Sequence, residues 1–292
     1  MAERFDFSLD GVEASVVGRA LGVDIRQFPL RIGNVTVDPV RFAQVAGRVF
    51  EALELRRLSI SGELHPAVRM AFELLRDRRV SVSINGVDGL GGDIAVLVVT
   101  DGAQALGITQ AHREDVLQFA LFADEDLVDV LSGVLPAAEA ATTGARTVED
   151  RPRAAAVSAM TARRQAEADD EETDAFGNIE LRAVVQARPA AERSKSARVR
   201  SARPRPRSED SAEVLERVLS GRRMGGGYLL ATGYGRRGEI LTANPLSWVD
   251  TEYGRYLAWT DTDELGTVSA HYEPAGRAEV GRAILSSISS IY

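Results

Sequence analysis

The residues that come closest to a chemical motif are those at positions 233–238. They read Gly-Tyr-Gly-Arg-Arg-Gly and match the dinucleotide-binding pattern G-x-G-x-x-G. That pattern binds a pyrophosphate only where a strand precedes it and a helix follows, because the helix N-terminus receives the phosphates. Here Glu239-Ile240-Leu241 continues as a strand. We therefore expect a hairpin turn and no bound cofactor.

Two further glycine-rich stretches lack the lysine of a phosphate-binding loop. Gly225-Gly226-Gly227 is not followed by Lys-Ser or Lys-Thr, and Gly89-Leu90-Gly91-Gly92 contains no lysine either. The first stretch is expected to let a helix pass into a strand, and the second to form the tip of a loop. Neither predicts nucleotide binding.

Metal and thiol chemistry find no support in the sequence. The three histidines are His65, His112 and His271, and no two have the helical spacing of zinc ligands. The absence of cysteine excludes disulfides, thiol catalysis and cysteine-ligated zinc. The acidic residues 261–264 form a turn without the remaining ligands of a calcium loop. With no G-x-S-x-G or Ser-x-x-Lys motif, we predict no catalytic, cofactor-binding or metal-binding residue and no enzyme.

The composition describes an acidic globular protein. A net charge of −8 and a pI near 5.1 argue against nucleic acid or an anionic membrane as the partner of the whole molecule. The first ten residues are charged where a signal peptide needs an apolar run. The most apolar segment, residues 94–99, is too short to span a bilayer. We expect a soluble, cytoplasmic protein that is a monomer or a weak dimer.

Residues 1–136 are expected to form one α+β subdomain. A helix begins at Asp38-Pro39, where the carboxylate can cap free N–H groups and proline suits the first turn. A second helix begins near Pro66. Residues 80–84 alternate apolar and polar, which predicts a half-buried strand. Residues 94–99 are apolar on both faces and predict a central strand. Strands at 105–109 and 116–121 and a helix capped by Asp124 complete the unit.

Residues 137–210 have a different composition. Alanine, arginine, proline and acidic residues dominate, with an acidic block at 167–174 and a basic block at 188–207. Such a segment cannot bury enough apolar surface to offset its ordering entropy. We expect a disordered, charged linker, in which residues 178–186 form an optional short strand.

Residues 211–292 repeat the order of elements in the first subdomain. A helix capped by Ser211 is followed by strands at 225–232, 239–248, 255–260 and 265–271, and a final helix begins near Pro274. Each half thus reads as helix, four antiparallel strands, helix. The predicted fold is α+β, with two similar subdomains related by pseudo-two-fold symmetry. The simplest assembly joins the two four-stranded units in a continuous or side-by-side sheet.

Residues 246–260 form the most distinctive stretch of the chain. They include both tryptophans and read as strand, tight turn, strand. Asp250 is placed either to accept hydrogen bonds from the turn backbone or to pair with Arg255. Together with the final helix, this stretch resembles the C-terminal end of the EspG family, the cytosolic chaperones of type VII (ESX) secretion in mycobacteria and related actinobacteria. The residues that carry the resemblance are Trp248, Asp250, Thr251, Gly254, Arg255 and Tyr256.

The resemblance implies a specific chaperone. It would bind the apolar tip of a helical secretion substrate, such as a PE–PPE heterodimer or a similar helical hairpin, and keep it soluble and competent for export. No cofactor and no membrane insertion are implied. The partner-binding candidates are chosen on physical grounds and comprise Gly89, Leu90, Gly91, Val96, Val98 and Tyr234. The two valines fit a plain core role equally well.

Two other functions stay open at the level of sequence. An adaptor for nucleic acid or another anionic partner would depend on the arginine-rich residues 198–207, although no aromatic residues are interleaved there for stacking on bases. An enzyme of unrecognised type would need a closed polar pocket with perturbed titratable groups.

Overall fold

The structure is a computed structural model that describes residues 4–33, 38–111, 115–150, 221–235, 237–263 and 266–291. The predicted helix at Ser211, the optional strand at 178–186 and the arginine-rich residues 198–207 lie outside the described residues.

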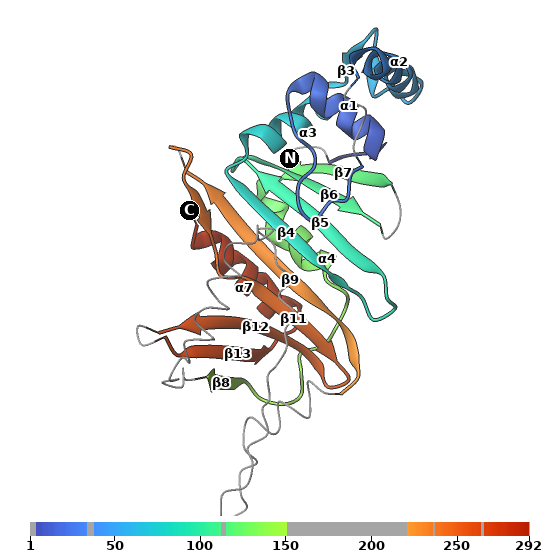
Figure 1. Ribbon diagram of the computed structural model, residues 1–292. Helices are drawn as coiled ribbons and strands as arrows, with labels where there is room; N and C mark the ends of the chain where they lie inside the picture. Colours follow the sequence, from blue (N-terminus) through green and yellow to red (C-terminus); the bar gives the residue numbers. More distant parts are fainter. Residues whose placement is uncertain are drawn as a thin grey trace, which may run out of the picture. The chain divides into compact units, whose positions relative to one another are not determined.

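An antiparallel sheet runs through both halves of the chain (Figure 1). Within the described residues it has 11 strands, in the order β1-β7-β6-β5-β4-β9-β11-β12-β13-β8, and β10 pairs with β9. The strands of the first half are β1 (Phe5–Asp10), β4 (Val80–Val87), β5 (Asp93–Thr100), β6 (Gln104–Gln110) and β7 (Val116–Ala123). Those of the second half are β8 (Arg146–Asp150), β9 (Arg223–Tyr234), β10 (Ile240–Thr242), β11 (Leu246–Thr251), β12 (Gly254–Thr262) and β13 (Val268–Pro274). A separate small hairpin pairs β2 (Ser59–Ile60) with β3 (Glu63–Leu64).

The mixed α+β class is confirmed, but the sheet is larger than the two four-stranded sheets that were predicted. β4 and β9 pair antiparallel along their length, from Val80 opposite Gly233 to Val87 opposite Gly226. This pairing joins the strands of both halves into one sheet. Sequence periodicity could not reveal it, because β4 and β9 are far apart in the chain.

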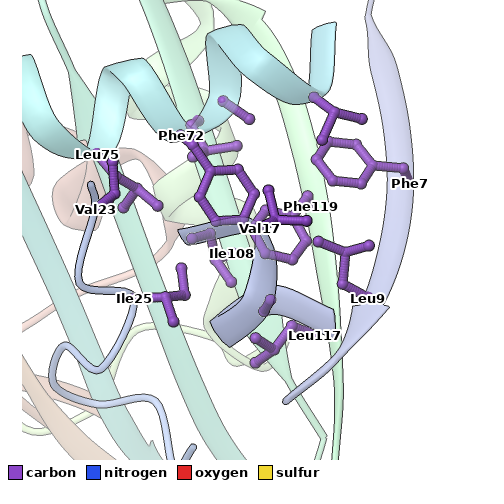
Figure 2. Packing of buried hydrophobic residues seen from close by; sticks show 14 of the residues in the cluster. Phe7, Leu9, Val17, Val23, Ile25, Phe72, Leu75, Ile108, Leu117 and Phe119 are labelled. Atoms are coloured by element: carbon purple, nitrogen blue, oxygen red, sulfur yellow. The ribbon is translucent and has the colours of Figure 1, made fainter. Parts of the chain in front are cut away.

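Two helices, α1 (Gly11–Leu21) and α3 (Pro66–Asp77), cover one face of the sheet in the first half. A third helix, α2 (Pro39–Leu55), packs against α1 and the β2–β3 hairpin. As predicted, the Asp38 side chain caps α2, accepting a hydrogen bond of 2.8 Å from the Arg41 N–H. The core beneath α1 and α3 is aromatic: Phe119 of β7 stacks on Phe7 at 4.7 Å and lies 5.9 Å from Phe72 of α3 (Figure 2).

The other face is covered by η1 (Asp124–Asp126), α4 (Leu127–Val134) and α7 (Arg277–Ser289), and α4 and α7 are in contact. Leu131 of α4 and Ile284 of α7 are buried against Trp248 of β11 and against apolar residues of β4, β5 and β9. Because successive side chains of a strand point to opposite faces, β5 contributes to both cores. Val96 and Val98 face α4 and α7, and the alternate residues face α1 and α3.

The predicted linker starts too early. Residues 137–150 lie on the second half of the sheet: the Arg255 N–H donates to Glu139 O at 2.8 Å, and the Ala141 N–H donates to Arg255 O at 3.0 Å. Ala141 is buried against Tyr256, and β8 then pairs with β13. These backbone partners order a segment that has few large apolar side chains. We call residues 137–145 the strap.

The strand predicted at residues 239–248 is interrupted in its middle. It is divided into β10 and β11. The Ala243 N–H still donates to Ala231 O of β9 at 3.0 Å, but Pro245 has no N–H to continue the ladder.

Candidate partner-binding surface

The hairpin of β11 and β12 is held by a buried ion pair. Arg255 Nε donates to Asp250 Oδ1 at 2.6 Å and Arg255 Nη2 donates to Asp250 Oδ2 at 2.7 Å, with 3% and 6% of the two side chains exposed. Nη2 also donates to Pro136 O at 2.7 Å, which fixes the start of the strap. Gly254 has φ +110°, as the predicted turn requires. Trp248 and Tyr256 are buried. These residues build the fold and are not accessible to a partner.

The turn between β4 and β5 presents one apolar side chain on a well-ordered backbone. Asp88 Oδ1 accepts hydrogen bonds from the Leu90 N–H at 2.8 Å and the Gly92 N–H at 2.7 Å, and the Asp88 N–H donates to Gly92 O at 2.8 Å. Gly91 has φ +83°. Leu90 is 97% exposed at the tip. The side chain of Leu90 is therefore exposed to solvent, while hydrogen bonds fix the backbone of the turn that holds it.

Gly89 brings this turn against the beginning of β9. A Cβ at Gly89 would lie 2.3 Å from Met224 O, so only glycine allows this approach. Four exposed apolar residues consequently gather at this end of the sheet, and we call them the tip patch: Val87, Leu90, Met224 and Tyr253. Of the four, sequence reasoning identified only Leu90. Val87 is close to Leu90 in the sequence, whereas Met224 and Tyr253 are distant, and the pairing of β4, β9 and β11 brings them to the same end of the sheet.

Val96 and Val98 do not belong to this surface. They are 5% and 1% exposed in the core beneath α4 and α7. Their proposed role as partner contacts is not compatible with that burial, because a partner could reach them only if the core opened. Both valines are core residues, which is the alternative that the sequence left open.

Tyr234 lies at the opposite end of the sheet from Leu90. Its N–H donates to Arg79 O at 2.8 Å, its hydroxyl accepts from Arg78 Nη2 at 3.2 Å, and the Arg78 guanidinium lies 4.6 Å from the ring centre. The length of β4 separates the two ends by about 25 Å. The structure therefore does not bring Tyr234 and the Leu90 turn into one site.

The G-x-G-x-x-G stretch is a hairpin turn between β9 and β10, as expected. The Gly235 N–H donates to Glu239 O at 2.9 Å, and Gly238 has φ +79°. A strand, β10, comes after it, so the turn does not lead into a helix N-terminus as the dinucleotide-binding pattern requires.

A groove between α7 and β11 to β13 has a volume of about 620 Å³. Its floor includes Leu246, Leu257 and Trp259, and Glu279 and Arg282 lie on its α7 side. Hydrogen bonds from the Glu279 backbone N–H and from Arg282 lower the pKa of the Glu279 carboxyl. A general acid working near neutral pH needs the opposite shift.

Among the described residues no cluster of three or more histidine and carboxylate side chains could hold a metal ion.

No helix in the described ranges combines the length and the apolar character needed to cross a membrane.

A model of the EspG family matches residues 10–285. The chain belongs to the EspG family. The likeness noted at the β11–β12 hairpin is thus confirmed over nearly the whole chain. The fold is similar to that of the Mycobacterium tuberculosis type VII secretion chaperone EspG5, solved in complex with the PE25–PPE41 dimer. The TM-score is 0.62 at 12% sequence identity, over 99% of this chain and 97% of EspG5. Comparison with curated protein sequences gave no match.

Proposed function

We propose that this EspG-family protein is a cytoplasmic chaperone of type VII secretion, without enzymatic activity, that binds the apolar tip of a PE–PPE-like helical dimer. The observation that carries the proposal is the tip patch, with Leu90 almost fully exposed on a turn held by Asp88. The likeness to EspG5, which was solved with a PE–PPE dimer, supports the choice of partner.

The tip patch has the physical properties of a protein-binding site. Burying a leucine side chain completely contributes about 1.5–3 kcal/mol, which corresponds to about a 10- to 100-fold change in affinity. The hydrogen bonds that fix the turn reduce the conformational entropy that binding would otherwise cost. Val87, Met224 and Tyr253 extend the apolar area around Leu90. The surface needs no cofactor to act.

We also propose that the two halves are related by pseudo-two-fold symmetry. The sheet order supports this, because β4-β5-β6-β7 and β9-β11-β12-β13 extend in opposite directions from the central β4–β9 pair. The helices that come after these runs, α4 and α7, lie on the same face and touch each other. A two-fold axis normal to the sheet between β4 and β9 would relate them.

The test is co-expression with a PE–PPE dimer encoded next to this chain in its own genome, with affinity capture and size-exclusion chromatography as the readouts. A stable complex is expected, with the dimer poorly soluble when expressed alone. Leu90→Lys should weaken binding by about 10-fold or more, because it places a charge in the apolar contact. Leu285→Lys is the matched control, since Leu285 is exposed on α7.

Failure of the wild-type chain to form a complex with any such dimer would refute the proposed function. A complex that tolerates Leu90→Lys as well as Leu285→Lys would refute the role of the tip patch. In that case the arginine-rich residues 198–207 would be deleted next, because the adaptor function predicted as the alternative depends on them.

A further inference from the structure

The strap is hydrogen-bonded through its backbone to the turn between β11 and β12. The Arg255 N–H donates to Glu139 O at 2.8 Å, and Arg255 O accepts from the Ala141 N–H at 3.0 Å. One residue further along the strap, the Thr142 N–H donates to Tyr253 O at 2.9 Å. In Figure 1 the green segment that leaves α4 passes the ends of β11 and β12 before it enters β8. The strap therefore lies against the turn that carries Tyr253.

The buried ion pair of this hairpin also holds the start of the strap. Arg255 Nη2 donates to Pro136 O at 2.7 Å, while the same guanidinium is bonded to both carboxylate oxygens of Asp250. The strap packs closely because position 254 is glycine: a Cβ at Gly254 would lie 2.7 Å from Ala140 O. The side chain of one residue and the lack of a side chain on its neighbour thus place the strap.

Tyr253, the residue of the tip patch on this turn, has its backbone fixed from two sides. Its N–H donates to Thr251 Oγ1 at 3.1 Å, and its carbonyl oxygen accepts from the Thr142 N–H. Thr251 belongs to β11 itself, whereas Thr142 is distant in the sequence. Tyr253 is 38% exposed. One of the two hydrogen bonds that hold this exposed residue in place is therefore supplied by the strap.

The strap also joins Tyr253 to the half of the chain that carries Leu90. It follows α4 closely, and Leu135 between them is buried in the core that α4 and α7 cover. The helix α4 contacts β5, and the turn that precedes β5 presents Leu90. A continuous series of contacts therefore runs from the Leu90 turn through β5, α4 and the strap to Tyr253.

We infer that the strap is a positioning element for the tip patch, so that docking of the strap and binding of the PE–PPE-like dimer are coupled. The inference rests on the proposed function and deepens it: Thr142 and Arg255 position Tyr253 and do not contact the partner. An anchor residue that is already held in place loses less conformational entropy on binding than a mobile one. The apparent affinity falls with the fraction of molecules that are competent to bind. A variant whose strap is docked in about one molecule in ten should bind about 10-fold more weakly.

The hydrogen bond from Thr142 can be tested with two substitutions at one exposed position. Thr142→Pro removes both the side chain and the N–H that Tyr253 O accepts from. Thr142→Ala removes only the side chain and is the matched control. We expect Thr142→Pro to weaken the complex with the PE–PPE dimer by about 10-fold and Thr142→Ala to change it by less than about 2-fold. Equal affinities of the two variants would overturn the inference, because either the strap does not position Tyr253 or the partner contacts Thr142 directly.

A second variant separates positioning from stability. Asp250→Leu with Arg255→Met removes the tether to Pro136 O together with both buried charges, and replacing both partners of a buried ion pair by apolar residues is often neutral for stability. Circular dichroism and thermal unfolding should show a folded chain, whereas the affinity for the dimer should fall by about 10-fold. A purely structural ion pair would lose no affinity once stability is restored. A folded double variant with wild-type affinity would therefore overturn the inference.

Hydrogen exchange measures the coupling from the other direction. Because linkage is reciprocal, binding of the dimer should favour the docked strap and slow exchange of the Ala141 and Thr142 amides by about 10-fold. The Gly235 amide, bonded to Glu239 O at the opposite end of the sheet, should not change. Strap amides that exchange at the same rate in the free chain and in the complex would refute the coupling.

The outcomes distinguish this inference from the proposed function. If the wild-type complex forms and is sensitive to Leu90→Lys but tolerates Thr142→Pro and the double variant, the inference is wrong and the proposed function stands. If no wild-type complex forms, the proposed function itself has failed.

Discussion

Removing the Asp250 carboxylate should test the contribution of the buried Asp250–Arg255 ion pair to stability. In Asp250→Ala, Arg255 keeps its hydrogen bond to Pro136 O but loses both bonds to the carboxylate, at 2.6 and 2.7 Å. The Arg255 side chain is 3% exposed. A buried charge would then remain without its counter-charge.

Two independent routes give the magnitude of the loss. Two hydrogen bonds to a charged group contribute about 1.5–3 kcal/mol each, and breaking one partner of a buried ion pair costs about 3–5 kcal/mol. We expect the free energy of unfolding to fall by about 4 kcal/mol, which is a large part of the about 5–15 kcal/mol that is typical of a folded domain. At about 2–4 °C per kcal/mol, the Tm should fall by roughly 8–16 °C.

Urea unfolding monitored by tryptophan fluorescence is a suitable assay, because Trp248 is buried on the same strand as Asp250. Asp6→Asn is the control: its ion pair with Arg4 is exposed on both sides and should leave stability unchanged within error. A double variant, Asp250→Leu with Arg255→Met, should recover much of the loss, since it removes both charges. A loss below about 1 kcal/mol in Asp250→Ala would refute the reasoning, because it would mean that water reaches Arg255 past the strap.

Two further predictions concern packing and pH. Gly227→Ala should lower the free energy of unfolding by about 1–3 kcal/mol, because its Cβ would lie 2.3 Å from Asn85 O and 2.4 Å from the Trp248 ring. Gly47→Ala, in α2 with no atom within 4 Å of the new methyl group, should instead stabilise by about 0.5–1 kcal/mol; urea unfolding that ranks the two alike would contradict this. Burial raises the pKa of the Tyr256 phenol, so the unfolded state releases its proton first and stability should fall as the pH rises above about 10. Tyr256→Phe should reduce that slope in unfolding curves at about pH 8 and about pH 10.5, on either side of the ordinary tyrosine pKa, and an unchanged slope would refute the assignment to Tyr256.

Local patterns in the sequence were sufficient for several features of the fold. The cap at Asp38, the α3 start at Pro66, the positive φ of Gly254 and the Asp250–Arg255 pair were all predicted and confirmed. Each depends on residues within a few positions of one another. Local backbone geometry and short-range hydrogen bonds decide such features, so the sequence contains the information in readable form.

The strand predicted at 239–248 failed for a local reason, Pro245, but the other incorrect predictions depended on contacts between distant residues. Composition placed residues 137–150 in the linker, but the backbone of β12 and β13 supplies partners for them. Val96 and Val98 were candidates for the partner-binding surface, because the sequence of an apolar strand does not indicate which of its faces is covered by a helix. Tyr234 and Leu90 were both placed in glycine turns, and the direction of β4 separates them.

By itself, the sequence determined the α+β class, most helix and strand positions, the hairpin at residues 246–260 and the likeness to the EspG family. Only the tertiary structure decided that β4 pairs with β9, which makes one sheet of the two halves. That pairing brings Met224 of β9 beside Val87 and the Leu90 turn. Strand pairing over long sequence separations depends on the combined burial of many side chains on both faces, and no local pattern of residues specifies it.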